Sequence, residues 1–239
     1  SSDVCSSDLA PQLKELRNTP LYNAGLIRYN GFFEGTIDNF TTRGFISTDA
    51  GSMDAALALR MSGPRQGFEG DIKKAVLNGG KLLGVPSSGM MRFNGKVSST
   101  GFSSKTPLRM KGDISAIDYK GYTYNDIIAD AVFTNDILSA NLSSADPNLS
   151  ANFTTVLDFS KKKQNYNARG AVAYANLHAL HLSKDSVVVS GLFDVNFSGT
   201  NIDDFRGYAR IYDAEVYNKR QLLNIDSLYL ESSIDENNT

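Results

Sequence analysis

The sequence has few of the residues on which redox and metal chemistry depend. Its 239 residues include one cysteine, Cys5, two histidines and no tryptophan. A lone thiol forms no disulfide within the chain, and two histidines without further ligands do not complete a zinc site. We therefore expect no metal site and no bound cofactor.

An excess of charge and long apolar runs are also lacking. The charges of the 24 basic and 26 acidic residues nearly cancel, so the sequence has no excess of basic residues that would indicate nucleic acid as a partner. No segment reaches the ~18 consecutive apolar residues of a membrane-spanning helix. We also find no nucleophile or phosphate-binding motif, and we expect no enzymatic activity.

The first nine residues, SSDVCSSDL, differ in character from the rest. Read as codons, they fit AGT TCA GAC GTG TGC TCT TCC GAT CT, which resembles a common short-read sequencing adapter. We interpret residues 1–9 as adapter-derived and exclude them from fold reasoning. Residues 10–239 are then expected to be an internal fragment of a longer protein, without any cysteine.

Apolar residues recur at every second position through most of the chain. In LSANFTTVLDFS, residues 149–160, the odd positions are mostly apolar and the even ones mostly polar. SVVVSGLFDVNFSG, residues 186–199, repeats the alternation, and Gly191 is a candidate bulge. This period is typical of half-buried β-strands.

Turn residues separate the alternating segments, as in ADPN at 145–148, KKKQN at 161–165 and NKR at 218–220. This spacing predicts an all-β chain of about 18 short strands joined as meanders. Helical spacing occurs only in APQLKELRN, from Ala10 to Asn18, and around Ala75–Leu83, so we expect one or two short helices.

Two segments share a degenerate internal pattern. RYNGFFEGTIDNFTTRGFISTDAG and VVSGLFDVNFSGTNIDDFRGYARIYDAE both place a Gly-Thr, an Ile-Asp and a Phe after an aromatic strand. Repetition of this kind favours an elongated sheet that grows by stacking similar units over a closed globule.

The order of several segments resembles the TamB-type members of the AsmA-like superfamily, in the divergent form typical of Bacteroidetes. These segments are GLIRYNGFFEGTIDNFTTRGFISTDAGSMDAALAL, KLLG, MKGDISAIDYKGYTYNDI, SANLSSADPNLSANFTTVLDFS, ANLHALHL and FSGTNIDDFRGYARIYDAEVY. The resemblance implies an elongated, curled, mostly antiparallel sheet, a β-taco, that forms an open apolar groove over residues 10–239.

The resemblance also implies a function. Such proteins are translocation and assembly modules, which are anchored in the inner membrane of Gram-negative bacteria and bridge the periplasm. They conduct phospholipid toward the outer membrane and support outer-membrane protein assembly. The expected partners are phospholipid acyl chains and, through parts of the parent protein outside this chain, an outer-membrane assembly-factor barrel.

We predict that the apolar face of the two clearest strands lines the groove. The predicted lining residues are Leu149, Phe153, Leu157, Phe159, Val187, Val189, Phe193, Val195 and Phe197. Two other functional classes remain open from the residues alone, because alternating strands are also typical of a secreted or cell-surface β-repeat adhesin and of an outer-membrane β-barrel. His178 and His181, three residues apart, are interpreted as surface or turn residues.

Overall fold

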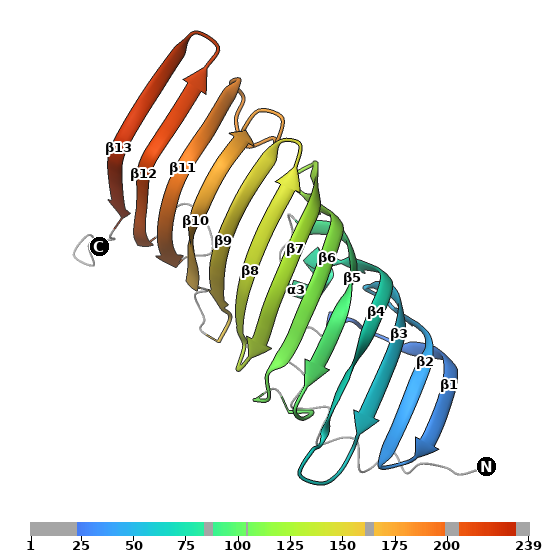
Figure 1. Cartoon of the computed structure of the whole chain (residues 1–239). Helices are drawn as coiled ribbons and strands as arrows, with labels where there is room; N and C mark the ends of the chain where they lie inside the picture. Colours follow the sequence, from blue (N-terminus) through green and yellow to red (C-terminus); the bar gives the residue numbers. More distant parts are fainter. Residues whose placement is uncertain (1–22, 84–87, 104, 161–164, 199–205, 233–239) are drawn as a thin grey trace, which may run out of the picture.

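The chain folds into one open antiparallel sheet (Figure 1). The structure is a computed structural model that describes residues 23–83, 88–103, 105–160, 165–198 and 206–232. Thirteen strands of the described residues pair in sequence order from β1 to β13, which confirms the predicted all-β class. The strands are β1 (Arg28–Thr36), β2 (Asn39–Thr48), β3 (Gly51–Arg60), β4 (Gly67–Asn78), β5 (Ser88–Ser99), β6 (Leu108–Tyr119), β7 (Tyr122–Thr134), β8 (Ile137–Asp146), β9 (Leu149–Asp158), β10 (Asn165–Asn176), β11 (Val187–Ser198), β12 (Arg206–Asn218) and β13 (Gln221–Ser232).

Two-residue turns join six of the twelve pairs of neighbouring strands. Lys120 and Gly121, between β6 and β7, both have positive φ, as do Asn135 and Asp136 between β7 and β8. Two-residue turns of this conformation match the right-handed twist of the strands they join. The strands reach 13 residues, so fewer of them fit in the chain than the expected 18.

One short helix interrupts the meander. The helix α3 (Gly79–Leu83) begins after β4, and Asn78 caps it by accepting a 2.9 Å hydrogen bond from the Lys81 amide. The predicted helix over Ala75–Leu83 was too long, because Ala75 belongs to β4 and is almost fully buried there. The predicted helix at Ala10–Asn18 and the adapter-like residues 1–9 lie outside the described residues. No helix in the described part is long and apolar enough to cross a membrane.

A line of irregularities bends the sheet near one edge. We call the edge with the Tyr119–Tyr122 and Asp146–Leu149 turns the upper edge, as it lies in Figure 1. Lys74, Asp126 and Asp213, inside β4, β7 and β12, have φ values of 50°, 51° and 46°. Register shifts accompany β3–β6 and β9–β12, and one adjoins Gly191. Because β-bulges bend and twist strands locally, this line creases the sheet below its upper edge.

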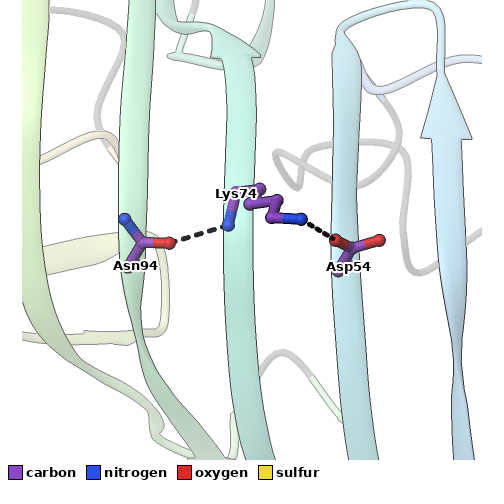
Figure 2. Close-up of polar contacts among 3 residues, drawn as sticks. All are labelled: Asp54, Lys74 and Asn94. Atoms are coloured by element: carbon purple, nitrogen blue, oxygen red, sulfur yellow. Dashed lines mark hydrogen bonds and ion pairs between the residues drawn. The ribbon is translucent and has the colours of Figure 1, made fainter.

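At the bulge of Lys74, side chains form the polar contacts that the interrupted strand ladder cannot provide. Figure 2 shows Lys74 of β4 between Asp54 of β3 and Asn94 of β5. The Lys74 amide donates a 2.7 Å hydrogen bond to Asn94 Oδ1, and Lys74 Nζ lies 3.8 Å from Asp54 Oδ2. The side-chain carbonyl thus replaces the ladder partner that a bulged amide loses.

The two self-similar segments occupy equivalent places in the fold. The first forms the β1–β2 hairpin, and the second contributes β11 and β12. In the first segment, Gly35 and Thr36 end β1, which, like β11, runs toward the lower edge. Residues 199–205 of the second segment lie outside the described part.

Candidate functional site

The strand registers align one apolar residue from every strand in a continuous row. Residues directly opposite each other in neighbouring strands share a face of the sheet, so the printed pairs can be followed from edge to edge. This central row is Gly31, Gly44, Ala55, Ile72, Gly95, Gly112, Ala129, Leu142, Phe153, Gly170, Phe193, Ile211 and Leu228. It contains no polar side chain.

Two further rows continue the same face toward the lower edge. The second row is Phe33, Thr42, Leu57, Gly70, Val97, Met110, Ala131, Ala140, Thr155, Ala168, Val195, Ala209 and Leu230, and the third is Gly35, Phe40, Leu59, Phe68, Ser99, Leu108, Phe133, Leu138, Leu157, Tyr166, Phe197, Gly207 and Ser232. We call these three rows the apolar face. None of its members carries a charge.

The opposite side of the sheet, the polar face, has the reverse character. Its row next to the central row includes Arg43, Asp71, Lys96, Lys111, Asp130, Arg169, Asp194 and Arg210. Opposite charges meet on neighbouring strands, as where Lys111 Nζ lies 3.4 Å from Asp130 Oδ2. The sheet is therefore amphipathic across its whole width, with water as the natural environment of the polar face.

The structure places the predicted lining residues of the strands on one face. Phe153, Leu157, Phe193, Val195 and Phe197 all belong to the apolar face and are half-buried. Leu149 and Val189 lie nearer the upper edge, with Val187 beyond them at the start of β11. Phe159 follows β9 and is half-buried at the lower edge. That they contact lipid remains a prediction.

A region of the apolar side above the central row is covered by the β10–β11 connection. A second cluster of Tyr124, Ala175 and Leu180 packs with Leu149 and Val189, and Leu180 comes from the β10–β11 connection. Another cluster, which comes first along the chain, consists of Ala55, Ile72, Ala75 and Phe93 and occupies β3–β5. Leu149 and Val189 are thus partly buried against the second cluster, and their contact with lipid remains a prediction.

Hydrogen bonds to the buried carboxylate of Asp146 connect residues at the upper edge, beside the second cluster. Asp146, 3% exposed, accepts hydrogen bonds from Tyr122 Oη at 2.7 Å, the Asn148 amide at 2.7 Å, and Asn125 N and Nδ2 at 2.8 and 3.2 Å. Burial by itself raises the pKa of Asp146, but these donors outweigh it and hold the pKa below the ordinary 3.8. Burial also raises the pKa of Tyr122. The network joins β7 to the β8–β9 turn.

Among the described residues, the second and third rows have no such cover. The described residues form no second sheet, and the strands against which α3 mainly packs are β4 and β5. Fully buried side chains of the apolar face are mostly alanines, while the large ones stay partly accessible. Near the sheet edges Phe33 is 64% exposed and Leu230 is 55% exposed. The lower part of the apolar face is therefore an open apolar surface.

Shallow depressions occur on the surface of the sheet over β6–β12. The best defined are lined by side chains such as Asp130, Asn141, Thr154, Arg169 and Asp194. Their linings are mixed, because Val132 and Val156 contribute to the first and Ile128, Leu142, Phe153, Leu192 and Phe193 contribute to the second. Among the described residues no second sheet lies over the apolar face, so a ligand lying on this open strip keeps one side in water.

Sequence reasoning missed much of the apolar face. Ile211, Leu228 and Leu230 continue it onto β12 and β13, and Leu142 joins it on β8. The signal was present in LLNIDSLYLES, but Asp226, opposite the bulge at Asp213, breaks the alternation there.

The two histidines lie in one connection without a third ligand side chain beside them among the described residues. His178 and His181 are both exposed in the β10–β11 connection, and His181 has φ of 59°. Among the described residues no three His, Cys, Asp or Glu side chains gather as metal ligands.

Comparisons with known proteins add no assignment. No protein-family model matches the sequence, and no match was found among the curated proteins or the solved structures.

Proposed function

We propose that this chain is the periplasmic bridge segment of a TamB-like protein and that its apolar face conducts phospholipid between the inner and outer membranes. The observation that carries the proposal is the continuity of the three apolar rows from β1 to β13 without a charge. The sequence resemblance supports the same function.

The chemistry of the surface suits acyl chains. Each methylene removed from water contributes ~0.8 kcal/mol, so a tail lying on the strip is held without any specific polar contact. Successive positions along the central row differ only among glycine, alanine and larger apolar residues, and the other two rows add a few uncharged hydroxyl side chains. Moving a tail by one strand therefore changes its free energy little, and the headgroup stays in water at the open side.

The dimensions also suit passage in steps. Neighbouring strands lie ~4.8 Å apart, so thirteen strands span roughly 58 Å. A lipid tail occupies about half of the ~30 Å hydrocarbon core of a bilayer, or roughly three strand spacings. The strip is thus several tail lengths long, which is what transfer along a bridge requires and a single binding pocket does not.

The wider setting belongs to the same proposal. The parent protein would be anchored in the inner membrane and would contact an outer-membrane assembly-factor barrel through parts outside this chain. No catalytic step is needed, because the lipid moves without chemical change.

Site-specific photo-crosslinking in Gram-negative cells tests the proposal. A photoreactive residue at 153, 193 or 197, on the apolar face, should capture phospholipid, whereas one at Asn152 or Asn196, on the polar face, should not. The paired positions are sequence neighbours, so expression and exposure to the cell envelope are matched. Equal labelling of the two faces, or none on either, would contradict the proposal and favour the adhesin-like alternative.

A further inference from the structure

A row of polar residues crosses the strands β7–β11 on the polar face. Each member lies directly opposite the next on the neighbouring strand, and the row is Asp130, Asn141, Thr154, Arg169 and Asp194. These strands lie in the interior of the sheet, between β6 and β12 (Figure 1). The row is therefore independent of either end of the sheet.

The two best-defined depressions of the sheet surface adjoin along this row. All five members of the row contribute to the lining of both depressions, and we call the combined hollow the polar trough. Apolar and aromatic side chains border it on both sides. They are Ile128, Leu192 and Tyr212 toward the upper edge, and Val132, Val156 and Tyr208 toward the lower edge. A polar floor thus lies between borders that offer apolar contact.

Contacts within the protein position the aromatic ring at the β12 end. Tyr208 Oη donates a 3.4 Å hydrogen bond to Asp194 Oδ1, and the guanidinium carbon of Arg210 lies 5.0 Å from the centroid of the Tyr208 ring. Because the ring is held before any ligand arrives, it loses little freedom on binding.

The middle of the row keeps polar groups for a ligand. The side chains of Asn141 and Arg169 form no hydrogen bond or ion pair with another described residue. Arg169 and Asp194 lie opposite each other on β10 and β11, yet they form no ion pair. A guanidinium donates hydrogen bonds and a carboxylate accepts them. Side by side, the two groups match an amide group, which has one carbonyl acceptor and one N–H donor.

The charges of the trough exclude other classes of partner. Lys111 and Arg169 balance Asp130 and Asp194, whereas a nucleic acid requires an excess of basic residues. A protein partner is disfavoured because the centres of protein interfaces are depleted of charged residues. A neutral ligand rich in hydroxyl groups fits better, because each hydroxyl both donates and accepts.

The length of the trough indicates a polymer. Five strands at ~4.8 Å spacing span about 19 Å, and the trough is open along this length, whereas sites for single small molecules are enclosed. A linear oligosaccharide meets these requirements. Its hydroxyls face the polar floor, and the apolar C–H faces of its rings pack against border side chains such as Leu192 and Tyr208.

We propose that the polar trough binds a neutral, linear oligosaccharide that carries N-acetyl groups, and that Arg169 and Asp194 together recognise one acetamido group. The site lies on the face of the sheet opposite to the apolar face. The inference does not depend on lipid transport.

Titration of the isotope-labelled 239-residue chain with chitotetraose, followed by NMR, tests the proposal. We expect saturable shifts centred on the amides of the five row residues. Cellotetraose has the same linkage but no acetamido group, so it should bind at least about tenfold more weakly.

Arg169→Ala and Asp194→Ala should each weaken chitotetraose binding by about tenfold or more, because each removes a charged hydrogen-bonding group. Arg43→Ala is the matched control, since Arg43 is also exposed and belongs to the continuation of the same row on β2, outside the trough. It should leave the affinity unchanged. Urea denaturation of each variant identifies any loss that comes from unfolding.

Three results would overturn the proposal. The first is the absence of saturable chitotetraose binding to the parent chain. The second is equal affinity for cellotetraose, which would remove the role of the acetamido group. The third is an equal loss of affinity in Arg43→Ala and in folded Arg169→Ala or Asp194→Ala, which would place the ligand outside the trough.

Discussion

Phe153 and Phe193 lie two strands apart, yet their ring centroids are only 6.2 Å apart. The residue between them in the central row is Gly170 of β10, which pairs with both. With no side chain at Gly170, the rings lean toward each other over β10 at a tilt of 55°. This contact makes the apolar face continuous across β9–β11.

We expect Gly170→Val to destabilise the sheet. A Cβ atom at Gly170 would lie 2.2 Å from the Asn152 carbonyl oxygen and 2.5 Å from Phe153 Cβ, both too close for real contacts. Overpacking of this kind costs about 1–3 kcal/mol of unfolding free energy, which urea denaturation measures. Ala171→Val, one residue along on the polar face, is the control and should be nearly neutral. Equal stability of the two variants would show that the central row does not need glycine there.

Leu180→Ala should be the more damaging of two substitutions in one connection. Leu180 is 1% exposed and packs in the second cluster, whereas Leu182, two residues later, is 49% exposed. Truncation of a buried leucine costs about 2–5 kcal/mol through lost burial and a cavity. Leu182→Ala should change the unfolding free energy by less than about 0.5 kcal/mol. Similar losses in thermal or urea unfolding would mean that the connection does not cover the upper edge.

Asp146 should make the stability of the chain depend on acid pH. Its folded-state pKa is held below 3.8, so the contribution of the carboxylate is fully present above the unfolded-state pKa and is lost as pH falls through the folded-state value. Asp146→Asn should therefore be less stable than the parent at pH 7, and the difference should shrink below pH 3.8.

Urea denaturation from pH 7 to pH 2 measures this difference. Asp185→Asn, at an exposed position of the β10–β11 connection, is the control and should follow the parent at every pH. A gap between Asp146→Asn and the parent that stays constant across this range would contradict a depressed pKa at Asp146.

The alternation of the sequence was sufficient to predict the strands but not their alignment. β9 and β11 follow the predicted segments closely, as do the turn at 145–148 and the bulge at Gly191, because each depends on local residue types. The central row depends on twelve separate registers between strands, and no local sequence pattern determines all of them together.

The positive-φ residues inside the strands and the burial of Leu180 could also not be predicted from the sequence. Asp126 and Asp213 adopt positive φ inside strands without a glycine to indicate it. Leu180 lies in NLHALHL, where its neighbours His178 and His181 suggest an exposed turn. Its burial depends on contact with Tyr124 and Ala175, which are distant in sequence. Ala75, predicted as helical, is held in β4 by similar long-range packing.

Phe193→Asp should separate the function of the apolar face from its folding. Phe193 is half-buried on the uncovered part of the face, so a carboxylate there can remain hydrated at the open side. We expect a loss of unfolding free energy well below that of Leu180→Asp, which forces a charge into the dry second cluster.

A lipid tail must pass over position 193, however, and the charge should reduce phospholipid capture by a photoreactive residue at 197 by about tenfold or more. Leu192→Asp, on the polar face and 43% exposed, is the matched control and should preserve capture. If Phe193→Asp unfolds the chain as severely as Leu180→Asp does, position 193 belongs to a dry core, and the lipid strip must be abandoned.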